Sequence, residues 1–235
     1  MSRPPRGGTR LAGVAVVATL LSGCSPVVAP AAAPATVPDE ALTGLLLSVN
    51  DIRTAMGGAR LLPQGVASGM DDNRNLLPNV NCLGVWHPDE SAIYGPSDAD
   101  GGWRAVRRQL LAPPGGDQWR SSAIQSVVSY GSVQDAKAFF DASAARWAAC
   151  VQHNVNITLN DQRLPHWRSG DLVTTPGRLT MPISRSDGAT SASCQHVLSL
   201  DENLIIDVQA CSPQTTPTSQ AGDIATRIAD NIPRE

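Results

Sequence analysis

The second half of the chain alternates short apolar runs with polar turns, a pattern typical of an antiparallel β-sheet. Runs at residues 193–200 and 204–211 flank the tripeptide Asp-Glu-Asn and predict a β-hairpin with the Glu-Asn pair at its tip. Runs at 103–111 and 121–130 predict two earlier strands. From residue 157 to the hairpin, short strand-like runs are separated by Gly, Pro and Asp.

Helical spacing of apolar residues predicts three helices. The longest is expected to start at Ser132, whose hydroxyl group can cap it, and its apolar stripe consists of Val133, Ala136, Phe140, Ala144, Trp147 and Val151. A shorter helix is predicted at 47–58, capped by Ser48 or Asn50, and another at 222–231.

The order of these elements predicts the fold class. Residues 59–81 show no clear period and are expected to form a loop, and His87-Pro88 is expected to begin one helical turn. Strands, a helix, more strands and a helix follow one another without regular βαβ alternation. This order predicts an α+β domain with one antiparallel sheet and helices packed on a face.

The N-terminus is organised like a bacterial export signal. Arginines in the first ten residues precede an apolar run at 11–21, about half of the ~20 residues that span a bilayer. The following "LSGC" resembles a lipobox, which implies a diacylglycerol on Cys24. The alternative is an ordinary secretory signal with an incidental cysteine. We expect a signal peptide at 1–23, an Ala/Pro-rich tether at 24–38 and one domain at 39–235.

Four further cysteines, Cys82, Cys150, Cys194 and Cys211, allow three pairings. The hairpin register places Cys194 opposite Cys211, at a separation that a disulfide accepts, which leaves Cys82 to pair with Cys150. A structural zinc site would need a closely spaced Cys-x-x-Cys pair, and the sequence has none, so no metal is predicted.

The net charge of the chain limits the classes of partner that we expect it to bind. The sequence has 18 basic and 21 acidic residues, and loss of the three signal arginines leaves a net charge of about −6. An acidic, aromatic-poor domain without a basic stripe argues against nucleic acid. With acyl chains on Cys24, the domain is expected on the outer face of the cell membrane, held by its lipid anchor.

Several short sequences resemble one known family. "NCLGVW" around Cys82, "RWAAC" ending at Cys150, the Cys194/Cys211 hairpin and "ATRIADNIP" near the C-terminus are similar to the PknH-like extracellular sensor domain. The resemblance covers about residues 45–233. That domain occurs on a mycobacterial membrane serine/threonine kinase and in many lipoproteins of the mycobacterial envelope.

The resemblance implies a fold and a function. It implies an antiparallel sheet against helices, two disulfides with the pairing inferred above, and a large surface cleft that receives a ligand. Unlike the kinase, this sequence shows no kinase domain and no transmembrane helix. A lipid-anchored form is therefore expected to bind a ligand without itself passing a signal through the membrane.

Catalytic motifs are missing from the sequence. No two of its four histidines have the i, i+4 spacing of a zinc site, and no G-x-S-x-G elbow occurs. Neighbouring acids in loops are usually only solvated. We expect neither an enzyme nor a cofactor.

A ligand cleft should be lined by aromatic and polar side chains that the core does not need. The candidates are Trp86, His87, Trp103, Trp119, Arg120, Arg185 and His196. Each Trp could instead fill a gap in the core. The sequence thus predicts a protein that binds a small molecule, a glycan or a lipid. The alternative is a module that docks on an envelope protein.

Overall fold

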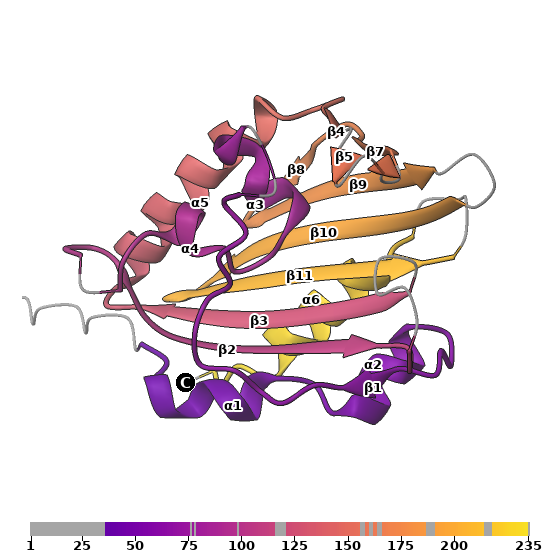
Figure 1. Ribbon diagram of the computed structural model, residues 1–235. Helices are drawn as coiled ribbons and strands as arrows, with labels where there is room; N and C mark the ends of the chain where they lie inside the picture. Colours follow the sequence, from indigo (N-terminus) through magenta and orange to yellow (C-terminus); the bar gives the residue numbers. More distant parts are fainter. Residues whose placement is uncertain are drawn as a thin grey trace, which may run out of the picture. The chain divides into compact units, whose positions relative to one another are not determined.

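Figure 1 shows a computed structural model of the protein, which describes residues 36–75, 77, 79–97, 99–115, 121–155, 158–159, 162–163, 166–186, 191–213 and 218–234. The predicted signal peptide, Cys24 and most of the predicted tether lie outside these residues, as do the ligand candidates Trp119 and Arg120.

Nine strands among the described residues form one antiparallel sheet in the order β1-β2-β3-β11-β10-β9-β7-β4, and β8 also pairs with β9. They are β1 (Leu62–Pro63), β2 (Trp103–Ala112), β3 (Ser122–Tyr130), β4 (Asn154–Val155), β7 (His166–Ser169), β8 (Val173–Thr175), β9 (Arg178–Ser186), β10 (Ser191–Asp201) and β11 (Leu204–Ser212). A separate ladder joins β5 (Thr158–Leu159) and β6 (Gln162–Arg163). The predicted α+β class is confirmed.

Helices cover both faces of this sheet (Figure 1). The α5 face is covered by α5 (Val133–Ala148), α3 (Leu83–Trp86) and α4 (Ser91–Tyr94). The α6 face is covered by α6 (Gln220–Asp230), α1 (Leu42–Leu45) and α2 (Val49–Ala55). Two 3-10 turns, η1 (Asp39–Ala41) and η2 (Val80–Cys82), precede α1 and α3.

The central strand β11 explains why the sheet is covered twice. Leu204, Ile206 and Val208 are buried in the core of the α6 face, whereas Ile205 and Cys211 are buried in that of the α5 face. Since alternate residues of a strand point to opposite faces, a strand that is apolar on both needs cover on both. The prediction of helices on a single face missed this two-sided pattern.

Local capping sets where the helices start. Ser48, rather than Asn50, caps α2 by accepting a hydrogen bond from the Asp51 amide at 3.2 Å. Ser132 caps α5 as predicted and accepts a hydrogen bond from the Asp135 amide at 3.1 Å.

Two helical predictions were wrong. His87-Pro88 does not begin a helical turn: α3 ends at Trp86, His87 is extended with φ −137° and ψ 129°, and Asp89 has a φ of 47°, so α4 starts only at Ser91. A residue that precedes proline is sterically driven out of the helical region, which explains the break. Helix α5 ends before Val151, which is 39% exposed and not part of the apolar stripe.

Both predicted disulfides are present. Cys82–Cys150 joins the end of η2 to the turn after α5, with a sequence separation of 68. Cys194–Cys211 joins facing residues of the β10/β11 hairpin, whose register is the predicted one. The first bridge therefore fastens the region around α3 to α5, and the second lies within the sheet.

Candidate functional site

A buried polar row crosses the α5 face. The strand register aligns Arg108 of β2, Ser126 of β3 and Asp207 of β11 side by side. Gln209, the next residue of β11 on the same face, lies opposite His196 of β10. Ser126, Asp207, Gln209 and His196 are all buried. These polar side chains are buried among apolar residues of β11. Burying a polar group costs free energy unless it forms hydrogen bonds, so each of them needs a partner.

Asp207 receives its partners from three elements. Its Oδ2 atom accepts hydrogen bonds from the Asp89 amide at 3.0 Å and from the Tyr94 hydroxyl group at 2.8 Å. Its Oδ1 atom lies 2.6 Å from Nε2 of His196. One carboxylate therefore joins the α3–α4 loop, α4 and β10 at the centre of the sheet.

His196 joins α3 to the same carboxylate. Its Nδ1 atom lies 2.8 Å from the carbonyl oxygen of Val85, opposite the Nε2 contact to Asp207. Each ring nitrogen of His196 therefore lies within hydrogen-bond distance of an oxygen atom, one from α3 and one from β11. The ring of Trp147 from α5 covers the imidazole, with 4.7 Å between ring centroids.

Asp89, in the loop between α3 and α4, is fully buried beside the polar row. Its carboxylate forms an ion pair with Arg108, which also pairs with Asp71. Its Oδ1 atom has no hydrogen-bond partner among the described residues. Burial raises the pKa of Asp89 to about 8, because removal from water outweighs the opposing effect of the Arg108 charge.

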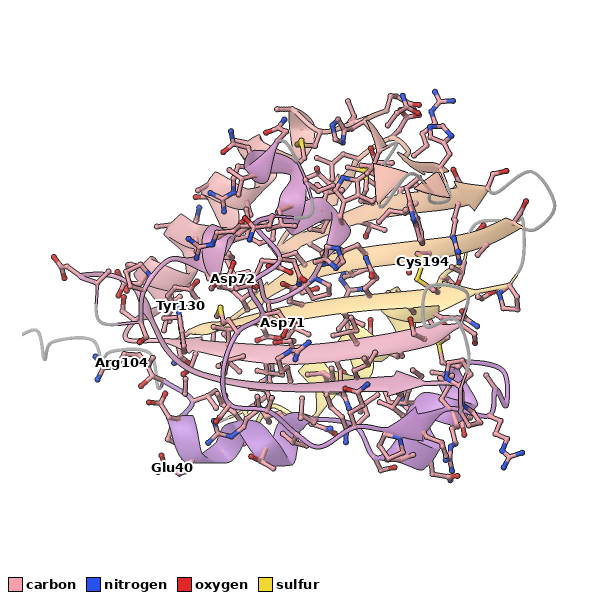
Figure 2. The ribbon with its side chains drawn as sticks, in the orientation of Figure 1. Glu40, Asp71, Asp72, Arg104, Tyr130 and Cys194 are labelled. Atoms are coloured by element: carbon pink, nitrogen blue, oxygen red, sulfur yellow. A yellow bond between two sulfur atoms is a disulfide. The ribbon has the colours of Figure 1, made fainter. Side chains whose placement is uncertain are left out.

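The chain between β1 and α3 crosses the α5 face, and we call residues 67–75 the crossing segment (Figure 1). Ala67 exchanges backbone hydrogen bonds with Arg108 at 2.9 and 3.0 Å. The Asp71 amide donates to the Asp89 carbonyl group at 3.1 Å, and the Asn73 amide donates to Glu90 at 2.8 Å. Figure 2 shows Asp71 and neighbouring Asp72 in front of the sheet. The crossing segment, which belongs to the loop predicted at 59–81, is therefore hydrogen-bonded to both β2 and the α3–α4 loop.

An aromatic cluster of Trp86, His153, Trp167 and Arg185 lies where α3 meets β7 and β9. The Trp86 indole donates to Nδ1 of His153 at 3.3 Å, and its ring meets Trp167 edge-on with centroids 6.4 Å apart. The Arg185 guanidinium lies over the Trp167 ring, 5.5 Å from its centroid. Trp86 is buried, whereas the other three are half-buried. The cluster thus combines a half-buried indole ring and a half-buried guanidinium group at one place.

The predicted ligand candidates do not form one group. Trp86 and Arg185 meet through Trp167, and His196 lies beneath α3 in the polar row. Trp103 is placed elsewhere: it faces Tyr130 at the start of β2, and its indole donates to the Gly95 carbonyl group at 2.9 Å.

His87 is half-buried at the end of α3. Burial, with a smaller effect from the charge of His196, lowers the pKa of His87 to about 4. Its ring is therefore neutral at physiological pH.

Sequence reasoning missed Trp167 and Asp207, and it treated the neighbouring acids Asp89 and Glu90 as solvated although both are buried. The signal for Asp207 was available in β11. Its α6-facing positions from Leu204 to Ala210 are apolar, whereas the opposite set consists of Ile205, Asp207, Gln209 and Cys211. Polar residues at two central positions of a buried face indicate a hydrogen-bonded site. No comparable pattern marks Asp89, whose partners lie on other elements.

A surface pocket of about 280 Å³ lies elsewhere, between α6 and the first two helices. Its lining consists of Leu46, Leu47, Ser48, Asp51, Arg227, Asp230 and Asn231. None of the predicted ligand candidates contributes to it. Within the described residues, we find no helix with the length and apolar character needed to cross a bilayer.

The fold and the site define a class of protein: an α+β domain with two disulfides, in which a buried row of polar side chains is hydrogen-bonded to a short helical segment. The chain belongs to the family described as PknH-like extracellular domain, which it matches over residues 37–231. Val37, the first matched residue, is already buried in the core of the α6 face.

The relatives and a solved structure agree with this family. Over 206 residues the chain is 29% identical to serine/threonine-protein kinase PknH of Mycobacterium bovis and of Mycobacterium tuberculosis H37Rv. These matches cover 88% of this chain but 33% and 32% of the kinases, so the chain spans about a third of their length. The crystal structure of the extracellular domain of PknH from Mycobacterium tuberculosis matches with a TM-score of 0.71 at 28% identity, covering 83% of this chain and 96% of that one. The family indicates an exported domain.

Proposed function

We propose that this protein is an exported lipoprotein whose α5 face binds a small molecule, a glycan or a lipid. The observation that carries the proposal is the aromatic cluster, in which Arg185 lies over the half-buried ring of Trp167. An aromatic face beside a guanidinium group suits a ligand with an apolar ring face or chain and a polar or anionic substituent. The role is binding rather than catalysis.

The cluster is held in place before any ligand arrives. Gln209 donates a hydrogen bond to the Trp86 carbonyl group at 2.9 Å, and the Cys82–Cys150 bridge fastens the start of α3. A site whose groups are already ordered loses less conformational entropy on binding. This rigidity favours a small ligand over a partner that must reshape the domain.

Native mass spectrometry of the protein purified from its own envelope tests the proposal. We expect an additional small mass on the wild-type chain, and its loss from Trp167→Ala. Trp103→Phe is the matched control, because Trp103 is also half-buried on the α5 face but lies outside the cluster. A bare wild-type chain, or an additional mass that Trp167→Ala retains, would contradict a ligand at the cluster.

The proposed anchor is a diacylglycerol on Cys24, after removal of residues 1–23, with residues 24–38 as tether. Each buried methylene contributes about 0.8 kcal/mol, so two or three acyl chains suffice to hold a soluble domain on a membrane. Intact-mass analysis of the mature chain should find Cys24 as its acylated first residue. A mature chain cut at another position and free of acyl groups would rule out the anchor.

A protein-interaction role is the second candidate, and one feature favours it. Leu62 and Val66 are 45% and 46% exposed beside the β1 edge of the sheet. Exposed apolar side chains at a sheet edge suit a protein partner. Cross-linking in the intact envelope should then yield a defined complex that L62Q/V66Q abolishes. Retention of that complex by this variant would contradict docking at the β1 edge.

A further inference from the structure

We propose that the α3–α4 segment, residues 83–94, is held on the sheet by a proton-dependent latch formed by Asp89, His196 and Asp207. Three hydrogen-bond contacts attach the segment to His196 and Asp207, in addition to the Gln209–Trp86 hydrogen bond and the Asp89–Arg108 ion pair. The Val85 carbonyl group faces His196, and the Asp89 amide and the Tyr94 hydroxyl group both donate to Asp207. These three contacts converge on the hydrogen-bonded pair of His196 and Asp207.

The latch depends on protons because it brings two acids together in a buried space. The Asp89 backbone amide is hydrogen-bonded to the Asp207 carboxylate, the Asp207 charge acts on the Asp89 carboxyl group, and Asp89 itself is fully buried. The Oδ1 atom of Asp89 lacks a hydrogen-bond partner among the described residues. An ionised Asp89 adds a second buried negative charge beside Asp207, which the Arg108 guanidinium offsets only in part, whereas a protonated Asp89 adds none.

Other titratable groups surround the latch, and together they set its response. They are His87, Glu90 and Tyr94 of the segment, Asp71 of the crossing segment, Arg108 of β2, Tyr130 of β3 and Arg146 of α5. Arg108 opposes the effect of burial on Asp89, whereas Asp71, Glu90 and Asp207 reinforce it. The lowered pKa of His87, which lies on the same segment, has the opposite effect on opening to the raised pKa of Asp89.

The sign of the response follows from the two shifted groups. The pKa of Asp89 is about 8 in the closed state and returns toward its ordinary value of 3.8 when the segment opens, so rising pH favours opening between these values. The pKa of His87 is about 4 when closed and ordinarily 6.5, so rising pH opposes opening between those values. Below pH 6.5 the His87 effect opposes that of Asp89, to which the raised pKa of buried Glu90 adds. The segment therefore loosens between about pH 6.5 and 8.

Release of the segment would also displace Trp86, which ends α3 and belongs to the aromatic cluster. The latch itself needs no ligand. A failed search for a ligand would leave it standing, and a failed latch would leave the cluster able to bind.

Hydrogen–deuterium exchange of the full chain in detergent, corrected for the intrinsic pH dependence of exchange, tests the latch. Between pH 6.5 and 8.5, we expect the protection of residues 83–94 to fall about tenfold relative to α6 on the opposite face. Asp89→Asn mimics the protonated acid and should remove this fall. The matched control is Asp72→Asn, which changes an exposed acid of the crossing segment and should keep it (Figure 2).

Two results would overturn the latch. One is wild-type protection of 83–94 that does not change with pH relative to α6. The other is an Asp89→Asn variant with the full wild-type fall. Should that variant not fold, the carboxyl ¹³C titration of Asp89 in the wild-type chain decides: a midpoint above about pH 6 supports the latch, and a midpoint below it overturns it.

Discussion

Asn203 holds the start of the domain to the tip of the β10/β11 hairpin, and its removal is the sharpest test of the packing. Its side chain accepts from the Val37 amide at 2.7 Å and donates to the Val37 carbonyl group at 3.2 Å and the Tyr130 carbonyl group at 2.9 Å. Asn203 and both partners are buried. Val37 is the junction between the proposed tether and the domain.

Asn203→Ala removes three hydrogen bonds and leaves three backbone groups buried without them. At about 1 kcal/mol for each group, we expect a loss of about 3 kcal/mol in the free energy of unfolding. For a domain of this size, that loss lowers the melting temperature by roughly 6–12 °C. Urea unfolding followed by tryptophan fluorescence measures the change.

Asn231→Ala is the matched control, because Asn231 also fastens the N-terminal region. It donates a single hydrogen bond, to the Leu45 carbonyl group at 3.0 Å, and its side chain is exposed. We expect a loss below about 1 kcal/mol. Equal losses in the two variants, or a loss below 1 kcal/mol in Asn203→Ala, would refute the reasoning.

Further predictions concern the disulfides and a helix cap. Removing Cys82–Cys150 (C82A/C150A) should cost ~4.4 kcal/mol for its separation of 68 residues, and removing Cys194–Cys211 (C194A/C211A) ~3.2 kcal/mol for its separation of 17. Urea unfolding should show the first variant as the less stable, and the reverse order would contradict the loop-length argument. Ser132→Ala should cost about 1 kcal/mol through loss of the α5 cap, whereas Ser132→Asp should retain most of the stability in the same assay.

The sequence predicted those parts of the fold that depend on local, repeated patterns. The β10/β11 register follows from a two-residue tip and a strand period of two, so Cys194 and Cys211 could be placed opposite each other correctly. The α5 helix has a capping serine and four turns of apolar spacing. Helices α3 and α4 have only four residues each, too few to show a period.

The candidate site was predicted only in part, because long-range contacts build it. His196 was selected as a ligand candidate, yet the structure shows it bound to Val85 and Asp207 inside the domain. The Asp89–Asp207 hydrogen bond joins residues 118 positions apart, and no local pattern encodes that contact. Trp86 and Arg185 were selected as separate ligand candidates, and Trp167, which connects them in the structure, lies in a strand too short to stand out.

The latch and the aromatic cluster share one part of the chain, the α3–α4 segment. The α3–α4 segment carries Trp86 into the cluster and Tyr94 and Asp89 onto Asp207. A domain built this way can couple proton uptake to the order of its ligand site without moving the sheet. The coupling needs no change in β10 or β11, whose positions are fixed by neighbours on both sides.

The central claim is that the α5 face binds a ligand at the aromatic cluster, and the indole N–H resonances of the ¹⁵N-labelled protein test it most directly. The probes are an aqueous extract and a lipid extract of its own envelope. We predict that one extract shifts the resonances of Trp86 and Trp167 and leaves those of Trp103 and the core residue Trp147 in place. Unmoved resonances of Trp86 and Trp167 with both extracts, or shifts at Trp103 alone, would contradict the account.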